Sequence, residues 1–267
     1  MQDVTFQKIR EVVYNRSGIS LGENKQALVR ARIAKRIRVL NLGSYEEYLE
    51  YMLDDSSGVE LENMLDVIST NTTNFYREDA HFDIMRQILK QWIEGGLRKL
   101  RVWCAAASTG EEPYTLAIEL LETIGDKRVD ARILATDIAP SVLKTALRGE
   151  YTEDKVEPVP KRLRHLYFER KRNGNGYIYT AGQVLKDLIL FRQLNLSVTP
   201  FPLKNQVDII FCRNVMIYFD RQVRARLVDE FKRLIRPGGY LFVGHAESIT
   251  AYSKGFKCLK PSVYIRE

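Results

Sequence analysis

Residues 99–117 read KLRVWCAAASTGEEPYTLA, and this stretch decides the fold class. An apolar run typical of a buried strand (99–105) passes through small residues into a helical pattern that begins at Glu111. The alternation continues, with strands predicted over 131–136, 207–212 and 240–245, helices over 111–124, 140–147 and 221–235, and a last strand within 257–266. Such alternation predicts an α/β domain with a parallel sheet covered by helices on both faces.

Three further segments surround or interrupt this alternation. Residues 1–68 carry helical apolar periodicity and predict an all-helical N-terminal domain, followed over 69–95 by a polar linker and a connecting helix. The α/β domain then spans 96–267. It is interrupted at about 167–195, where the glycines and asparagines of RKRNGNGYIYTAG predict a hairpin and a small antiparallel β-subdomain.

The composition excludes several classes of protein. With 45% hydrophobic and 28% charged residues in 267, the chain has the profile of an ordinary globular protein. No apolar run approaches the roughly 18 residues that a membrane-spanning helix needs, so we expect no insertion into a membrane. The first residues, MQDVTFQKIREVV, do not resemble a secretory signal, and a cytoplasmic protein is expected.

The cysteines and histidines show no ligand spacing. A disulfide framework or a cysteine-based zinc site is disfavoured because no C-x-x-C pair occurs, and reduced thiols are expected. The histidines give no metal-binding pattern either, so we predict no metal. The six residues are Cys104, Cys212, Cys258, His81, His165 and His245.

Charge is distributed unevenly in the N-terminal region. Residues 25–38 contain six basic residues and no acid, whereas 46–66 contain eight acids and no base. Apolar residues at 29, 33, 37 and 40 form a stripe, which predicts an amphipathic helix with a cationic outer surface. That surface could bind an acidic partner, as the net charge of +7 suggests, or its arginines could pair with the acidic segment nearby.

The loop after the first strand is a candidate ligand site. In an open α/β sheet a ligand binds beyond the carboxyl ends of the strands, and the small residues at 105–108 let the backbone approach it closely. The loop lacks both G-x-G-x-x-G and a phosphate-binding lysine, which disfavours NAD and ATP. Glu111 and Glu112 would repel a pyrophosphate, so we expect a cationic or neutral ligand, although acids in a first helical turn are also ordinary.

Polar residues elsewhere fit the same site. Asp137 ends the second strand, where this type of fold hydrogen-bonds the hydroxyls of an adenosine ribose, although Asp-x-x-Pro is also a common helix entry. Asn71, Thr73 and Arg77 are spaced by two and four residues, so their side chains can converge. Without a ligand, this segment is an ordinary polar linker.

Six strings occur in a distinctive order: TNTTNFYRE, VWCAAASTGEEPYTLA, ATDI, Asn195-Leu196, FCRNVMIYF and GHAES. Together they resemble the CheR family of chemotaxis receptor methyltransferases, over nearly the whole chain from residue 25 onward. The resemblance implies a Rossmann-like methyltransferase sheet, a helical N-terminal domain and an inserted β-subdomain. It also implies transfer of a methyl group from S-adenosylmethionine to receptor glutamates, giving glutamate methyl esters and S-adenosylhomocysteine.

The resemblance also assigns roles to individual residues. Arg77 and Tyr218 match residues beside the reacting methyl group. Basic residues of the cationic helix match the face held to dock on the acidic coiled-coil methylation helices of the receptor; they are Arg32, Lys35, Arg36 and Arg38. The implied cofactor contacts are Asn71, Thr73, Arg77, Glu111, Asp137, Asn195, Leu196, Arg213 and Asn214. Many relatives have two phenylalanines where this chain has Phe75-Tyr76, a departure expected to have little effect.

Two rival functions remain open at this stage. A nucleic-acid methyltransferase would suit the pI of 9.2, but amine-directed methyltransferases carry Asn/Asp-Pro-Pro-Tyr/Phe where this chain has Cys212-Arg213-Asn214-Val215, so no nucleic-acid partner is expected. A catalytically inactive cofactor-binding signalling module is the second rival. We expect a monomer. The receptor, its target glutamates and any capture of a receptor C-terminal peptide by the β-subdomain stay undetermined.

Overall fold

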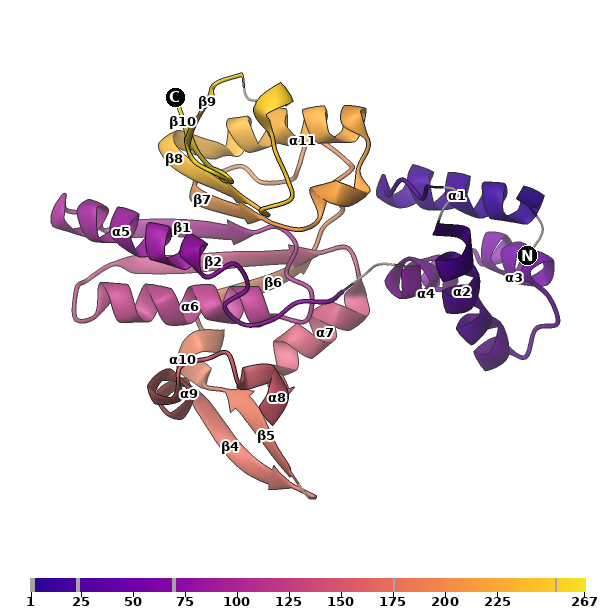
Figure 1. Ribbon diagram of the computed structural model, residues 1–267, viewed down its shortest axis with the longest axis horizontal. Helices are drawn as coiled ribbons and strands as arrows, with labels where there is room; N and C mark the ends of the chain where they lie inside the picture. Colours follow the sequence, from indigo (N-terminus) through magenta and orange to yellow (C-terminus); the bar gives the residue numbers. More distant parts are fainter. Residues whose placement is uncertain (1–2, 23–24, 69–70, 175, 253) are drawn as a thin grey trace.

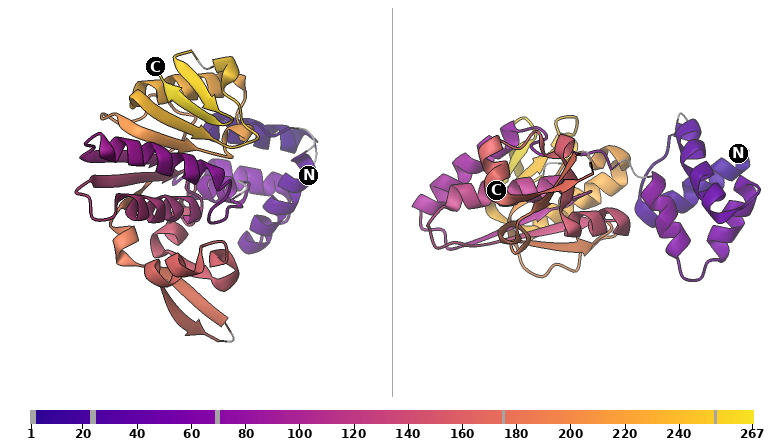
Figure 2. Two further views of the ribbon diagram at one scale, coloured as in Figure 1. Left: turned by 60° about the vertical axis from the view of Figure 1, so that its left-hand side comes forward. Right: turned by 90° about the horizontal axis from the view of Figure 1, so that it is seen from below.

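The computed structural model describes residues 3–22, 25–68, 71–174, 176–252 and 254–267. It contains a helical bundle, a large sheet with helices on both faces, and a small three-stranded sheet (Figure 1). The bundle lies beyond the carboxyl ends of the parallel strands, and the two views in Figure 2 show the same placement. Within the described residues, no helix is long and apolar enough to cross a bilayer.

The N-terminal bundle forms because each helix buries one apolar stripe. Ile9, Val13, Ile33 and Met64 are fully buried in it. The chain leaves the second helix through Asn41, which adopts a left-handed conformation. The four helices are α1 (Asp3–Ser17), α2 (Gln26–Leu40), α3 (Tyr45–Asp54) and α4 (Val59–Ile68).

The large sheet has seven strands in the order β6-β2-β1-β7-β8-β10-β9. The first five are parallel, and β10 and β9 add an antiparallel hairpin at one edge. The strands are β1 (Lys99–Cys104), β2 (Asp130–Asp137), β6 (Ile189–Gln193), β7 (Val207–Cys212), β8 (Ile235–Val243), β9 (Phe256–Lys260) and β10 (Val263–Arg266). This arrangement confirms the predicted α/β fold class.

Helices cover both faces of the sheet. On one face α5 and α6 pack over side chains such as Val102 and Ile133. On the other face α11 packs over Trp103 and Ile210, because neighbouring residues of a strand point to opposite faces. The helices around this sheet are α5 (Ala80–Glu94), α6 (Glu111–Ile124), α7 (Pro140–Arg148) and α11 (Arg221–Leu234), with 3-10 turns η2 (Met216–Tyr218) and η3 (Thr250–Tyr252).

The small sheet, of order β3-β5-β4, is antiparallel throughout and begins earlier than the expected 167–195. Its first strand starts at Glu150, whereas Ile189–Gln193, expected inside the insertion, pairs with β2 in the large sheet. Its elements are β3 (Glu150–Thr152), α8 (Glu153–Val156), α9 (Lys161–Tyr167), β4 (Phe168–Asn173), β5 (Gly176–Ala181) and α10 (Gln183–Lys186). The β4–β5 hairpin has the predicted strands, although Asn175 in its turn lies outside the described residues.

The bundle is joined to the large sheet by hydrogen bonds that involve the backbone. Ile19 and Phe219 form an antiparallel bridge, and the N–H of Ser20 donates to the carbonyl of Tyr218 at 2.8 Å. The side-chain amide of Asn195 donates to the carbonyl of Arg16 at 2.6 Å. Residues 16–20 therefore pack directly against two loops at the carboxyl ends of the strands.

Candidate functional site

A cavity lies between the bundle and the carboxyl ends of β1, β2 and β7. Eight of the nine predicted cofactor contacts line it, as does Tyr218; the eight are Asn71, Thr73, Arg77, Asp137, Asn195, Leu196, Arg213 and Asn214. The bundle contributes a wall of its own: Ser17, Ile19, Leu21, Lys25, Leu28, Val29, Arg32 and Ile68. No sequence signal marked these residues as cofactor contacts, since they are ordinary residues of amphipathic helices and a short loop; Arg32 was predicted instead to dock on the receptor.

The loop after β1 forms the floor of the cavity. The N–H of Ala105 donates to the carbonyl of Phe211 and that of Ala107 to the carbonyl of Thr136, both at 2.8 Å, so the loop hydrogen-bonds to strands on either side. Ser108 adopts a left-handed conformation, with φ of 47°. Ala105, Ala106 and Ser108 of this loop line the cavity, and close approach of a ligand to their backbone stays a prediction.

Gly110 is required by both the backbone and the packing at the start of α6. Its φ is +101°, and a Cβ there would lie 2.9 Å from the Cβ of Ala146 and 2.7 Å from the hydroxyl of Tyr151.

We expect Gly110→Ala to lower the free energy of unfolding by about 3 kcal/mol, because it combines backbone strain with overpacking. Urea denaturation measures this. Gly58→Ala is the matched control, because Gly58 has φ of +71° and nothing within 4 Å, so a loss of only about 1 kcal/mol is expected there. Equal losses would contradict the packing argument.

Asp137 is held with both carboxylate oxygens engaged. One oxygen accepts from the N–H of Ser108 at 2.8 Å, and the other accepts from the N–H of Ala139 at 3.1 Å. Burial raises the pKa of Asp137 above its usual value, although the backbone N–H donors partly oppose that rise. Each oxygen keeps a further acceptor direction, which suits the two neighbouring hydroxyls of a ribose.

The two acids at the start of α6 face different surroundings. Glu112 lines the cavity, and its carboxylate accepts from Arg213 Nε at 2.6 Å and from Cys104 Sγ at 3.2 Å. Glu111 is 1% exposed, accepts from Thr109 and Lys155, and does not line the cavity. Helix phase decides which acid faces the ligand, so the predicted contact at Glu111 fits this geometry less well than one at Glu112.

The turn that carries Arg77 is anchored by aromatic residues. Phe75 is buried, with ring centroids 4.9 Å from Tyr151 and 5.7 Å from Phe168 of the inserted subdomain. The hydroxyl of Tyr76 donates to Glu119 at 3.0 Å. The tyrosine at position 76 thus makes a hydrogen bond that a phenylalanine could not make. Arg77 itself donates to the carbonyl of Thr72 at 3.0 Å and lines the cavity.

A second anchor holds the loop after β7. Asn214 adopts a left-handed conformation, with φ of 58°. The buried carboxylate of Glu247 accepts from the N–H groups of Asn214, Gly244 and Ile217 at 2.8, 2.7 and 3.2 Å. Burial raises the pKa of Glu247, against the effect of these backbone donors. Glu247 belongs to the GHAES string, but an acid followed by serine carries no signal of this anchoring role.

Tyr218 lies in the short turn η2 at the cavity wall. Its backbone carbonyl accepts from Ser20, and the Nζ of Lys25 lies 5.2 Å from the centre of its ring. The tyrosine and Arg77 therefore reach the same cavity from segments far apart in the sequence. The bundle contacts both the backbone and the ring of the tyrosine.

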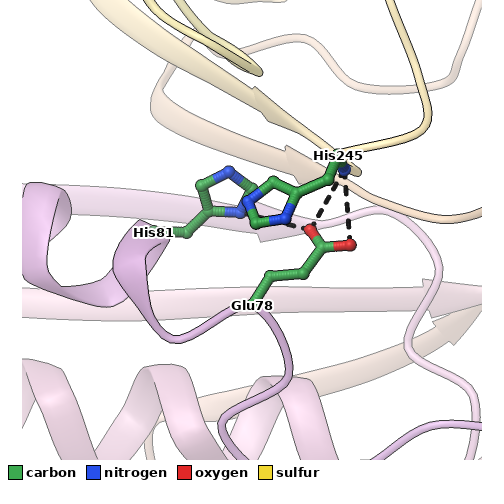
Figure 3. A group of neighbouring side chains, drawn as sticks. All are labelled: Glu78, His81 and His245. Atoms are coloured by element: carbon green, nitrogen blue, oxygen red, sulfur yellow. Dashed lines mark hydrogen bonds and ion pairs between the residues drawn. The ribbon is translucent and has the colours of Figure 1, made fainter.

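Three side chains beside the cavity have the composition of a metal site. Ligand atoms of Glu78, His81 and His245 lie within 4.8 Å of one another (Figure 3). However, the guanidinium of Arg213 lies 3.0 Å from His81 Nδ1 and 3.4 Å from Glu78. Its positive charge would repel a metal cation bound by these side chains. Burial and Arg213 lower the pKa of His81 to about 4, which leaves it neutral. The absence of a metal stays a prediction from the sequence.

The four predicted docking cations of α2 divide into two pairs. Lys35 and Arg38 are exposed. Arg36 forms an ion pair with the buried carboxylate of Glu60, and Arg32 donates to the backbone carbonyls at the end of α4. Pairing of an arginine with the acidic segment is therefore found at Arg36, whereas docking of a partner on Lys35 and Arg38 stays a prediction.

Two family models match the chain. CheR methyltransferase, all-alpha domain, matches residues 5–69, and CheR methyltransferase, SAM binding domain, matches residues 71–265. The chain belongs to the CheR family. It is a chemotaxis methyltransferase that depends on S-adenosylmethionine, which confirms the predicted family, enzyme class and cofactor.

Full-length relatives agree with these models. The chain is 39% identical to chemotaxis protein methyltransferase 2 of Pseudomonas aeruginosa, over 97% of this chain and 91% of that protein. It is 35% identical to the chemotaxis protein methyltransferase of Borreliella burgdorferi, over 96% and 92% of the two chains. The corresponding Escherichia coli protein is 32% identical over 99% and 91%. The CheR match thus covers the bundle and the sheet alike.

Proposed function

We propose that this CheR protein transfers the methyl group of S-adenosylmethionine to glutamate carboxylates of chemotaxis receptors, giving methyl esters and S-adenosylhomocysteine. One observation carries the proposal: a single cavity brings Asp137, Glu112 and Asn214 together with Arg77 and Tyr218. The first three suit a cofactor with ribose hydroxyls and positive charge. The last two suit a carboxylate substrate beside it.

The lining of the cavity fits the parts of the cofactor. Asp137 accepts from the ribose hydroxyls, and the small residues of the β1 loop let the backbone approach. Glu112 contributes negative charge, although the Arg213 guanidinium shares it. When bound, S-adenosylmethionine supplies an electrophilic methyl group on a sulfonium. The wall from the bundle then limits access of water to the reacting atoms.

The substrate group needs no general base. A glutamate with a pKa of about 4.3 is ionised at neutral pH and can attack directly. Arg77 orients that carboxylate through charge-assisted hydrogen bonds, and Tyr218 donates to its second oxygen or packs beside the methyl group. Among the described residues of the cavity wall there is no histidine, which agrees with a mechanism based on alignment.

The exposed cations of α2 suit an acidic receptor helix. Lys35 and Arg38 supply attraction that guides association and register. The proposal needs one copy of the chain and a cytoplasmic location, in keeping with its free cysteines Cys104, Cys212 and Cys258.

The division among the α2 cations leads to a prediction. We expect Lys35→Glu combined with Arg38→Glu to weaken binding of a receptor fragment at least tenfold, with the weakening reduced by salt, because the affected charges are exposed. Binding of S-adenosylhomocysteine should not change. Arg36→Ala is instead expected to lower the free energy of unfolding by about 2 kcal/mol, because it leaves the buried Glu60 carboxylate without its cation. Unaltered receptor affinity in the double variant would contradict docking through this face.

The decisive experiment measures the reaction itself. Purified protein is mixed with radiolabelled S-adenosylmethionine and membranes that contain chemotaxis receptors. We expect base-labile label on the receptors, as methyl esters require. Calorimetry with S-adenosylhomocysteine tests cofactor uptake separately. Binding without any transfer would instead support the inactive signalling module, and absence of binding would overturn the proposal.

A further inference from the structure

Glu78 connects two segments that both line the cavity. It follows Arg77 in the sequence, and its carboxylate reaches the loop after β7. There it accepts from the side-chain amide of Asn214 at 3.1 Å and from Arg213 at 3.4 Å. The backbone N–H of His245 donates to both of its oxygens at 3.3 Å, as Figure 3 shows.

The turn around Arg77 has an unusual backbone. Tyr76 and Glu78, on either side of the arginine, have φ of 55° and 54°. Non-glycine residues in this conformation are costly, and they persist where the surroundings over-determine them. Here the side chain of Tyr76 is tied to Glu119 on one flank, and that of Glu78 is tied to Asn214 on the other. Arg77 therefore projects from a turn that is fixed at both ends.

The same contact determines the orientation of an amide. A carboxylate can only accept hydrogen bonds, so the NH₂ group of Asn214 must face Glu78. Burial raises the pKa of Glu78, but the hydrogen bond from Asn214, the charge of Arg213 and the N–H of His245 outweigh it, and the net pKa is lowered. The carboxylate is thus ionised at neutral pH. The carbonyl oxygen of Asn214 remains available to the cavity that this residue lines.

The surrounding packing leaves little room around the amide of Asn214. Gly244 lies so close that a Cβ there would be 2.6 Å from the amide nitrogen of Asn214. The backbone of Asn214 is held at the same time by Glu247. Two carboxylates from different segments therefore hold one asparagine, one through its backbone and the other through its side chain.

We propose that Glu78 is a positioning residue: it orients the amide of Asn214 so that a carbonyl acceptor faces an N–H or O–H donor of the cofactor, and it holds Arg77 at the substrate. The inference rests on the proposed function, because it assumes that the cofactor occupies this cavity. Glu78 touches neither cofactor nor substrate in this scheme and acts through Asn214 and the turn.

A reversal of the hydrogen bond tests the proposal. Asn214→Asp places two carboxylates against each other and is expected to weaken S-adenosylhomocysteine binding at least twentyfold. Adding Glu78→Gln lets the new amide at position 78 donate to the new carboxylate at position 214, which again presents an acceptor to the cavity. We expect the double variant to bind at least fivefold tighter than Asn214→Asp alone. Calorimetry measures both dissociation constants, with melting temperatures recorded for each variant.

The control separates a hydrogen bond from a general loss of negative charge. Asp79→Asn removes an exposed acid of the same turn, so its combination with Asn214→Asp should give no rescue. Rescue by Asp79→Asn, or none by Glu78→Gln, would overturn the inference. If Asn214→Asp does not fold, the Glu78→Asp variant tests the inference instead. Its shorter side chain keeps the charge but does not reach the amide of Asn214. Near-normal affinity for S-adenosylhomocysteine and near-normal turnover in this variant would overturn the inference. Failure of the unaltered protein to bind S-adenosylhomocysteine would instead count against the proposed function.

Discussion

Arg77→Ala is expected to lower kcat by at least 100-fold while leaving the protein folded. Its guanidinium lines the cavity and donates only to the carbonyl of Thr72 among the contacts described, so in the proposed function its loss affects positioning of the substrate more than the fold. Misplacement of reacting groups by about 1 Å can cost a factor of roughly 100 in rate. Initial rates of radiolabel transfer to receptor membranes, at saturating S-adenosylmethionine, measure the effect.

The matched control for this variant is Arg128→Ala, which removes an exposed arginine from the loop before β2. It should leave kcat within about twofold of the unaltered protein. Arg77→Lys retains the charge without the planar fork of donors and is expected to recover only part of the rate. A near-normal kcat for Arg77→Ala would remove this arginine from the chemistry.

Asp137→Ala is expected to weaken binding of S-adenosylhomocysteine by at least 100-fold. In the proposed function the carboxylate accepts two hydrogen bonds from ribose hydroxyls, and bonds to charged groups contribute about 1.5–3 kcal/mol each. The N–H groups of Ser108 and Ala139 also lose their acceptor, which loosens the cavity floor. Calorimetric titration with S-adenosylhomocysteine measures the loss.

Asp66→Ala provides the comparison for Asp137→Ala. Asp66 is another acid at the junction of bundle and sheet, it accepts from the hydroxyl of Ser141, and it does not line the cavity. Its replacement should change the dissociation constant less than threefold. Equal weakening by the two substitutions would mean that general negative charge, and not ribose contacts, explains the effect of Asp137.

The predicted elements and family were confirmed because they depend on local patterns. The strand over 207–212 has the predicted bounds, and the helix predicted over 221–235 differs by one residue. Apolar runs and helical periodicity identify such segments without knowledge of their neighbours. Two segments differ more. The strand predicted over 240–245 spans Ile235–Val243. At Ile189–Gln193 an apolar run adjoining the hairpin signal suggested the small sheet, whereas parallel pairing with β2 placed it in the large one.

The candidate site was predictable in its membership more than in its details. The resemblance carried by the ordered strings predicted that Asn71, Asp137 and Asn214 contact one ligand. All three line the same cavity. The resemblance assigned the contact to Glu111, whereas Glu112 lines the cavity; both occupy the first turn of α6, and only the rotation of that helix against the sheet separates them. The site residues stay predictions until variants such as those above are measured.

Periodicity was enough to predict the α/β sheet and the cationic helix, and the family resemblance carried by the short strings was enough to predict the cofactor. Which charges are bound internally and which are exposed became clear only from the packing of the elements. Arg36 hydrogen-bonds to Glu60, which is 24 residues away in the chain, and Glu78 accepts from Asn214, which is 136 residues away. Such pairings arise from how whole elements pack, and no local pattern at either residue encodes the other.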